Sequence, residues 1–146
     1  MKKTANEMTL EFPSHSCNEG FARAAVACFA AQMDPTLNEL EDIKTSVSEA
    51  VTNAIVHAYP ESIGKVVIRA RICEGNVLEI TVKDRGRGIA DVEQARRPMF
   101  TTGGEERSGM GFTIMESFMD KLAVKSVPGR GTSVSMKKKL AVRAKR

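Results

Sequence analysis

Aromatic side chains are scarce in this sequence. Its 146 residues include no Trp, one Tyr and 6 Phe. Because proteins hold unpaired bases largely by stacking them on aromatic rings, a role in binding single-stranded nucleic acid is poorly supported. The net charge of +4 owes much to basic residues near the end of the chain, and a solvated tail explains them more simply than a nucleic-acid site. We therefore expect no direct contact with DNA.

Cysteine and histidine are also few. Cys17, Cys28 and Cys73 are widely spaced and form no C-x-x-C pair, so neither a disulfide framework nor a zinc site is expected and a reducing compartment fits best. The two histidines belong to no H-E-x-x-H motif, which argues against a transition-metal centre. Cys17 and Cys28 fall in a helical region, where we expect them to pack as small apolar side chains.

Long apolar runs are absent as well. No segment approaches the roughly 18 apolar residues that span a bilayer, and the basic first residues are followed by polar ones, unlike a signal peptide. We expect a cytoplasmic protein with no membrane contact. With 42% hydrophobic and 27% charged residues, the composition is that of a globular protein. A single domain over residues 1–146 is predicted, with 139–146 as a basic tail.

Two helices are predicted in the first half of the chain. Apolar residues recur at helical spacing over residues 18–33, before Asp34-Pro35 ends the pattern, because proline disfavours helix in the residue before it. The buried side of this helix is expected to hold Phe21, Ala24, Ala25, Cys28, Phe29 and Ala31. The second helix begins with Thr36 and Glu39, which have the spacing of a capping box, and it runs to about His57. Its apolar side is expected to hold Leu40, Ile43, Val47, Val51, Ala54 and Ile55.

Alternating and β-rich segments indicate the strands. The predicted strands are residues 8–12, 65–73, 77–83, 123–127 and 132–138. Glu74-Gly75-Asn76 is a good hairpin signal between two of them, and a third helix is predicted over residues 109–119. Helices followed by hairpins predict an α+β fold, namely a two-layer sandwich with a mostly antiparallel mixed sheet and helices on one face.

Residues 85–108 lack periodicity and are rich in glycine and charge. A loop of this length inside a compact domain is commonly functional, so we predict a lid over a binding site. Within it, Thr101, Thr102 and Arg107 are candidates to contact phosphate groups when the lid closes.

Asp84-x-Gly86-x-Gly88 directly follows a predicted strand. A carboxylate at a strand end can accept a hydrogen bond from the exocyclic amine of adenine, which guanine does not offer at that position. The glycines leave room where backbone and base approach, and they permit unusual dihedral angles. An ordinary turn is the alternative, because Asp and Gly are common turn residues.

Gly109, Met110 and Gly111 open the third predicted helix. The unpaired N–H groups and partial positive charge of a helix N-terminus suit a phosphate. Ser108 could instead cap this helix, and glycines that simply end a loop fit the pattern equally well. No P-loop lysine follows and no G-x-G-x-x-G succeeds the first strand, so neither a Walker site nor a dinucleotide fold is expected.

Glu49, Asn53 and His57 lie at positions i, i+4 and i+8 of the second predicted helix, and so on one face. The Asn53 carbonyl oxygen suits magnesium, which prefers oxygen ligands shared with phosphates. Glu49 could orient or deprotonate an attacking hydroxyl. His57 is placed to bond near the helix end, and we do not interpret it as a phosphoacceptor. A solvated polar stripe is the alternative.

Taken in order, these motifs resemble those of the GHKL superfamily of ATP-binding domains. The segments are E-A-V-T-N-A-I-V-H at 49–57, D-R-G-R-G-I at 84–89, F-T-T at 100–102 and R-S-G-M-G-F-T-I-M at 107–115. M-T-L-E-F at 8–12, F-A-R at 21–23 and the whole run 43–55 are further similar to bacterial anti-sigma-factor serine kinases. The similarity is greatest to the sporulation branch that acts on sigma factors of the sigma-F type, and it covers about residues 8–138.

The resemblance implies a Bergerat-type ATP-binding sandwich that forms a homodimer. It also implies inhibition of a sporulation sigma factor and ATP- and magnesium-dependent phosphorylation of a small anti-anti-sigma protein on serine, with ADP as product. By motif, Glu49 would be the catalytic base, Asn53 the magnesium ligand and Asp84 the adenine-binding acid, and Arg23 would contact the sigma factor. Further nucleotide contacts are implied at His57, Gly86, Gly88, Thr101, Thr102, Arg107, Ser108, Gly109, Met110 and Gly111.

The chain departs from this family at the predicted lid. The family tends to carry a lysine soon after F-T-T in a slightly longer lid, whereas here Gly103-Gly104-Glu105-Glu106 follows. Two alternatives remain. A binding module could use nucleotide only as a structural ligand, although sequestration alone would not need Glu49. An orphan histidine-kinase catalytic domain would need a phosphoacceptor histidine, and neither His15 nor His57 is placed to serve.

Overall fold

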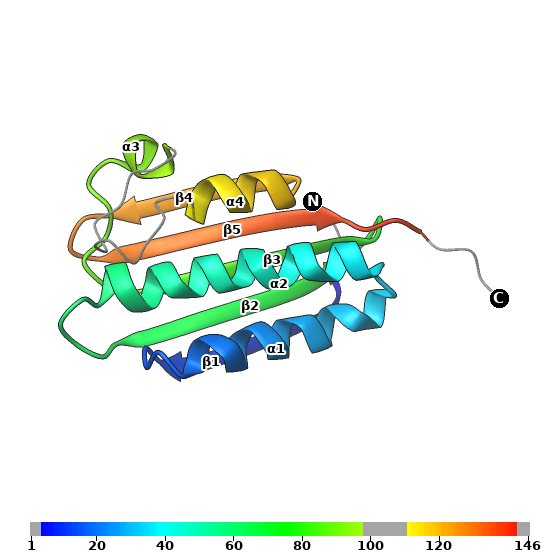
Figure 1. Ribbon diagram of the computed structural model, residues 1–146, viewed down its shortest axis with the longest axis horizontal. Helices are drawn as coiled ribbons and strands as arrows, with labels where there is room; N and C mark the ends of the chain where they lie inside the picture. The colour runs from blue at the N-terminus through cyan, green and yellow to red at the C-terminus, as the bar shows by residue number, and fades with distance from the viewer. Residues whose placement is uncertain (1–3, 98–110, 143–146) are drawn as a thin grey trace.

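The computed structural model describes residues 4–97 and 111–142. Within these ranges one five-stranded sheet has the order β1-β2-β3-β5-β4, every neighbouring pair antiparallel. The strands are β1 (Thr4–Pro13), β2 (Lys65–Cys73), β3 (Val77–Asp84), β4 (Lys121–Val127) and β5 (Gly131–Lys139). Three helices lie in front of the sheet in Figure 1, namely α1 (Asn18–Ala30), α2 (Leu37–Thr52) and α4 (Gly111–Phe118). The predicted α+β fold with helices on one face is therefore confirmed.

The hairpin between β2 and β3 forms where the sequence predicts it. Gly75 has φ 82° and Asn76 φ 61°, the left-handed conformations that a tight turn between twisted strands requires. The Asn76 side chain donates from Nδ2 to the carbonyl oxygen of Leu140, 2.9 Å away. This bond fastens the turn to the segment that leaves β5.

Helix α2 begins with the predicted capping box. The backbone N–H of Glu39 donates to Thr36 Oγ1 at 3.1 Å, and the N–H of Thr36 donates to Glu39 Oε1 at 2.9 Å. The helix packs between α1 and α4 over the sheet. Its apolar side is buried as predicted at Ile43, Val47, Val51 and Ala54, and Ala50 is buried as well. Leu40 and Ile55, also expected there, are partly buried. The regular helix ends at Thr52 and continues as a π-helix, η2 (Asn53–Ala58), which the periodicity did not indicate.

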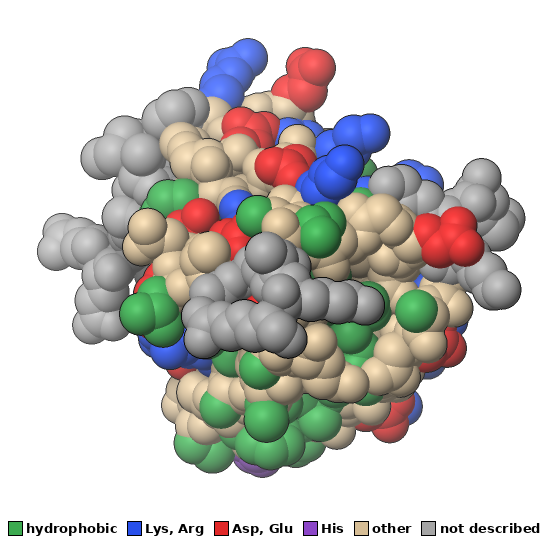
Figure 2. Space-filling model, turned by 90° about the vertical axis from the view of Figure 1, so that its right-hand side faces the viewer, with side chains coloured by type: hydrophobic (Ala, Val, Ile, Leu, Met, Phe, Trp, Pro, Cys, Tyr) green, Lys and Arg blue, Asp and Glu red, His purple; other side chains and the backbone are tan. Residues whose placement is uncertain are grey.

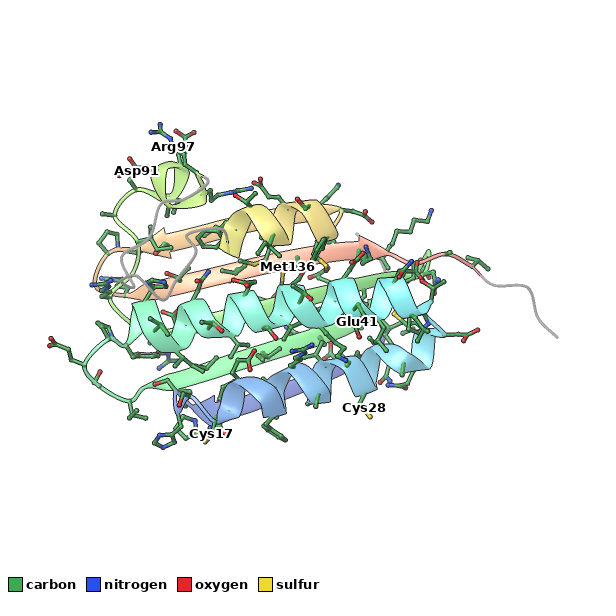
Figure 3. All side chains as sticks on the ribbon, viewed as in Figure 1. Cys17, Cys28, Glu41, Asp91, Arg97 and Met136 are labelled. Carbon is green, nitrogen blue, oxygen red and sulfur yellow. The ribbon has the colours of Figure 1, made fainter. Side chains whose placement is uncertain are left out.

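Helix α1 turns a different face to the core than predicted. Its buried residues are Ala22, Val26, Phe29 and Ala30, and a short 3₁₀ helix, η1 (Ala31–Met33), follows. Four of the side chains expected inside are exposed, namely Phe21, Ala24, Cys28 and Ala31. Cys17 and Cys28 are also exposed and point away from the body of the molecule in Figure 3. The prediction was wrong because apolar residues occur on both sides of α1, and small residues give helical periodicity little contrast.

The segment after β3 contains structure that the sequence did not predict. A short helix, α3 (Val92–Arg96), begins at Asp91, whose Oδ1 accepts from the N–H of Gln94 at 3.1 Å. Residues 98–108 of the predicted lid lie outside the described residues. In the described part of the chain, no helix combines the length and hydrophobicity that crossing a membrane requires.

Candidate functional site

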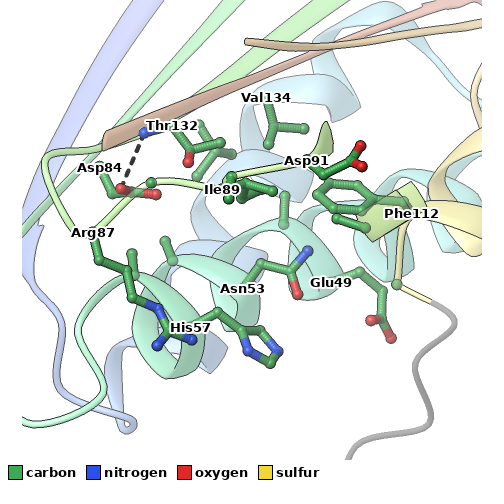
Figure 4. A pocket seen from close by; sticks show the side chains of 18 of the residues that line it. Glu49, Asn53, His57, Asp84, Arg87, Ile89, Asp91, Phe112, Thr132 and Val134 are labelled. Atoms are coloured by element: carbon green, nitrogen blue, oxygen red, sulfur yellow. Dashed lines mark hydrogen bonds between the residues drawn. The ribbon is translucent and has the colours of Figure 1, made fainter. Parts of the chain in front are cut away.

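A cavity of about 460 Å³ opens between the helical layer and one end of the sheet. Its walls come from α2 and η2, the end of β3 and the residues after it, α3, the start of α4, and β5 (Figure 4). This volume lies in the range of small-molecule sites, roughly 300–1,000 Å³. Elements distant in sequence therefore build one binding cavity.

Asp84 is the last residue of β3 and lines this cavity. Its Oδ1 accepts from the N–H of Gly86 at 2.9 Å and from the N–H of Thr132 at 3.2 Å. Burial raises the pKa of this carboxyl, and the two backbone hydrogen bonds oppose that rise. Within the described ranges Oδ2 accepts no hydrogen bond, so a ligand that carries a donor would satisfy it.

The turn after Asp84 is held tightly against η2 and the β4–β5 hairpin. The N–H of Arg87 donates to the carbonyl oxygen of Ala58 at 3.1 Å, and the N–H of Gly129 donates to the carbonyl oxygen of Arg87 at 2.7 Å. Gly88 has φ 76°, a conformation that favours glycine, and it lines the cavity. Gly86 does not belong to the cavity lining; it packs against the Ala58 backbone and supports Asp84 through its N–H.

The polar stripe of α2 and η2 faces the cavity. Glu49, Asn53 and His57 are partly buried and all three line it, as Figure 4 shows from α2 toward η2. They are therefore not the solvated polar face that the sequence left open. Asn53 and His57 lie on the π-helical turn, a rare geometry that is frequent at functional sites.

Gly111 brings the start of α4 close to this stripe. A β-carbon added there would lie 3.1 Å from Glu49 Oε2 and 3.5 Å from Asn53 Oδ1 and Nδ2. A side chain would therefore crowd the carboxylate–amide pair. The other residues predicted around this helix start and in the lid lie outside the described residues: Thr101, Thr102, Arg107, Ser108, Gly109 and Met110.

The oxygen donors here fit a magnesium ion shared with phosphates. Asn53 offers an amide oxygen beside the space that Gly111 leaves open, and the Glu49 carboxylate, the candidate base, lies next to it. Among the described residues no group of three or more His, Cys, Asp or Glu side chains could hold a metal ion. Magnesium commonly takes only one or two protein oxygens and completes its shell with phosphates and water, so the small donor set suits this ion.

Several cavity residues were not predicted from the sequence. Thr132 and Val134 come from β5, Ile89 from the turn after β3, and Phe112 from α4. Thr132 is opposite Asp84 in the β3–β5 register, a pairing between residues 48 positions apart. No local pattern marks such a residue, and only the strand order could have identified it.

Arg23 lies apart from this cavity. It is partly buried on α1 and does not line the cavity. A role for Arg23 would therefore concern a partner protein rather than the nucleotide.

Comparisons with known proteins agree with the fold. The family model of the histidine kinase-like ATPase domain matches residues 15–138. The chain is similar to an anti-sigma F factor of Caldanaerobacter subterraneus subsp. tengcongensis, 59% identical over 134 residues that cover 91% of this chain and 93% of that protein. It is also 59% identical, over 137 residues, to an anti-sigma F factor of Pasteuria penetrans, with 92% of this chain and 91% of that protein covered.

Solved structures share the fold at lower sequence identity. The RsbU and RsbW domains of Rv1364c from Mycobacterium tuberculosis match 93% of this chain and 33% of that chain, with a TM-score of 0.70 and 18% identity. The histidine kinase domain of the Erythrobacter litoralis EL346 blue-light activated histidine kinase matches 84% of this chain and 61% of that chain, with a TM-score of 0.58 and 24% identity. By its sequence relatives and its matching domain, the chain belongs to the anti-sigma F factor family and is built on a histidine kinase-like ATPase domain.

Proposed function

We propose that this protein is an ATP-dependent serine kinase that binds and inhibits a sporulation sigma factor of the sigma-F type. Its phosphate acceptor would be a serine of the anti-anti-sigma protein, which phosphorylation inactivates. The observation that carries the enzymatic part is one cavity with two chemically different ends. Asp84 lies at one end, and Glu49 and Asn53 lie on α2 and η2 at the other.

The Asp84 end of the cavity supports adenine recognition. The carboxylate is fixed through Oδ1 by two backbone donors, which leaves Oδ2 to accept a hydrogen bond from the exocyclic amine of adenine. The apolar side chains of Ile89 and Val134 also line the cavity and offer a surface for the flat base. This arrangement favours adenine over guanine because guanine carries a carbonyl oxygen at the corresponding position.

The Glu49 end supports phosphoryl transfer. The Glu49 carboxylate can accept the proton of a serine hydroxyl as that oxygen attacks the γ-phosphate of ATP, while ADP leaves. Asn53 would hold the magnesium ion, which neutralises charge on the phosphates when bound. The open space beside Gly111 allows phosphate groups to reach both side chains.

The partner assignment rests on the relatives. Proteins named anti-sigma F factor align with at least 91% of this chain, so the surfaces that give those proteins their name have counterparts here. Arg23, on α1 and away from the cavity, is the proposed contact to the sigma factor.

We also propose that the protein forms a homodimer through α1. The exposed side chains Cys17, Phe21, Ala24, Cys28 and Ala31 follow one another at helical spacing; we call this set the α1 stripe. Phe21 is 54% exposed, and hydrophobic side chains gather along the lower edge of the face in Figure 2, at the level of α1. An apolar stripe on the outside of a helix suits a second protein surface.

The decisive experiment uses radiolabelled ATP, magnesium and the candidate anti-anti-sigma protein. We expect transfer of label to the acceptor as acid-stable phosphoserine. Acid-labile label would indicate a histidine kinase instead, and no transfer with intact sigma binding would indicate a pure binding module. A pull-down from cells with ATP or ADP present would identify the sigma factor and the acceptor, and its failure to recover a sigma factor would contradict the regulatory part.

A further inference from the structure

The face of the sheet opposite the helices holds a second concavity. It has a volume of about 530 Å³ and is bounded by the ends of β2, β3, β4 and β5 nearest the β4–β5 turn. We call it the basic groove, defined by Lys65, Lys83, Arg85, Lys125 and Arg130. Helices α1, α2 and α4 lie in front of the sheet in Figure 1. Lys65, Lys83 and Ser133 are next in sequence to the buried Val66, Val82 and Val134, so they point to the other face and the groove lies behind the sheet.

The cations of the basic groove lack the partners found elsewhere on the same face. Within the described residues, Lys83, Arg85, Lys125 and Arg130 form no ion pair, and all four are exposed. Lys65 alone has an acidic neighbour, Glu11, at 3.5 Å. Four like charges gathered at one end of a sheet repel one another, and an anionic partner would relieve that repulsion.

The far end of the same face is arranged differently. There Arg71 lies 3.7 Å from Glu7 and 3.5 Å from Glu79, and Lys137 lies 3.8 Å from Glu79. At that end Arg71 and Lys137 therefore have acidic neighbours within the chain. The groove differs from this end because Lys83, Arg85, Lys125 and Arg130 line one concavity and form no ion pair among the described residues.

The spacing of these cations favours an extended ligand over a single small anion. Lys83, Ser133 and Lys125 share one row across β3, β5 and β4, so the two lysines are separated by two interstrand spacings, roughly 10 Å. Alternate side chains of an extended peptide lie about 7 Å apart. Two carboxylates on such a peptide can therefore each approach a different lysine.

The groove also contains apolar and hydroxyl side chains but no aromatic ring. Val67 and Val127 line it together with Ser126 and Ser133, and Val127 is 53% exposed. A single-stranded nucleic acid would find no ring to stack on among the lining residues. An extended acidic peptide with its carboxylates on one face matches the cations, and the two valines add apolar surface to the groove.

We propose that the basic groove binds an acidic, extended segment of a partner protein. The groove shares Asp84 and Thr132 with the nucleotide cavity but opens on the other face of the sheet. We expect peptide and nucleotide to bind at the same time. This proposal does not depend on kinase activity, because no part of it uses Glu49 or phosphate transfer.

The test measures binding of a fluorescently labelled heptapeptide of alternating Glu and Val to the full chain saturated with ATP and magnesium. Saturation keeps the acidic peptide out of the nucleotide cavity. We expect binding at low salt that weakens as salt is added, and no binding of the matching Gln–Val peptide. Binding that ATP abolishes, or equal binding of the Gln–Val peptide, would overturn the proposal.

Matched charge reversals locate the site. Lys83→Glu with Lys125→Glu should weaken peptide binding at least ~10-fold. The control variant, Lys121→Glu with Lys139→Glu, makes the same change of net charge on exposed strand residues at the far end of β4 and β5. It should change the affinity for the peptide less than about 2-fold. Equal losses in both variants would mean that only net charge matters and would contradict the site.

Two further measurements keep the result interpretable. If the double reversal melts early or loses ATP affinity, Lys83→Gln with Lys125→Gln replaces it, and unchanged peptide binding in that variant would refute the proposal. A single-stranded oligonucleotide of equal charge is titrated in parallel. If the oligonucleotide binds more tightly than the peptide and the same variants abolish its binding, the groove would be assigned to nucleic acid instead.

Discussion

At the scale of single residues, the buried charge of Asp84 costs folding free energy, and the fold does not require a charge at this position. Burial disfavours its charged form, and two backbone N–H groups compensate only in part, since the pKa remains raised. Selection for stability alone would favour an uncharged residue here. A ligand that binds the carboxylate therefore explains better why this residue is acidic. The consequences can be separated experimentally, because stability and binding should respond in opposite directions.

Asp84→Asn should weaken ATP binding about 10- to 100-fold, which corresponds to roughly 1.5–3 kcal/mol for a hydrogen bond to a charged group. Without ligand the variant should be at least as stable as the parent at neutral pH. Because the folded-state pKa lies above the ordinary value of 3.8, the folded protein binds this proton more tightly, and stability falls as pH rises from 3.8 through the folded-state pKa. The substituted amide does not titrate in this range, and its oxygen can still accept the two N–H bonds.

Nucleotide titration and thermal melting across the acidic range check this prediction. Asp91→Asn is the matched control, because Asp91 also lines the cavity and asparagine can replace it as the cap of α3. A ligand-free Asp84→Asn protein that melts well below the parent would instead assign Asp84 a structural role.

Glu49→Gln should leave ATP affinity nearly unchanged while lowering phosphate transfer at least ~100-fold, the usual scale for loss of a general base. The isosteric amide keeps the packing against Gly111 but cannot take the proton. Single-turnover transfer and nucleotide titration separate the two quantities. Glu41→Gln, on an exposed position of α2, serves as the control, and parallel loss of affinity and transfer would contradict the assigned role.

At the scale of elements, the features predicted correctly are those set by residues close together in the sequence. The β2 boundaries and the Thr36–Glu39 capping box were predicted correctly because turn and cap residues act over a few positions. The π-helical turn at Asn53 was not predicted, since no residue type in that segment indicates a change from α-helical to π-helical geometry. The β4 strand begins at Lys121, two residues earlier than predicted, because its start is set by pairing with Lys137.

In the candidate site, too, residues in short motifs were predicted and residues brought in by strand pairing were not. Glu49, Asn53 and Asp84 belong to short motifs, so the types and spacing of these residues were enough to indicate their chemistry. Thr132 belongs to no motif, and reaches Asp84 only through strand pairing. The buried face of α1 could not be chosen from the sequence, because apolar residues occur on both of its sides.

Thr36→Ala should lower the free energy of unfolding by about 1 kcal/mol, the typical cost of losing an N-cap side chain. Thr36 Oγ1 accepts the N–H of Glu39, and Glu39 Oε2 in turn accepts the N–H of Ala141 at 2.9 Å. The cap therefore fastens α2 to the segment after β5 as well. Chemical denaturation measures the loss, Thr36→Ser should restore most of the stability, and a serine variant as unstable as the alanine one would contradict a capping role.

At the scale of the whole molecule, three surfaces are distributed over different sides. The nucleotide cavity lies between helices and sheet, the basic groove lies on the bare sheet face, and the α1 stripe lies along the outer edge of the helical layer. Variants on one surface should therefore leave the others intact, except at Asp84 and Thr132, which line both the cavity and the groove. This separation makes partner binding and nucleotide binding independently testable.

Arg23→Glu should weaken binding to the sigma factor while sparing ATP affinity, because Arg23 does not line the cavity. Loss of the guanidinium removes a donor that can bind a carboxylate in bidentate fashion, and the new charge repels the same partner. Calorimetry with the purified sigma factor and with ATP checks both parts. Arg69→Glu, on β2 of the opposite sheet face, is the control, and an unchanged sigma affinity of Arg23→Glu would refute the contact.

Phe21→Glu should convert the dimer into a monomer, raising its dissociation constant at least ~10-fold by placing a charge within the buried stripe. Phe21 is 54% exposed in the single chain and contributes nothing to the nucleotide cavity, so ATP affinity should persist. Ile63→Glu makes the same change at a residue that is 58% exposed and lies outside α1, and it should leave the dimer intact. Sedimentation equilibrium decides: a Phe21→Glu protein that still dimerises like the parent, or a parent that is monomeric throughout, would mean that the α1 stripe serves another partner.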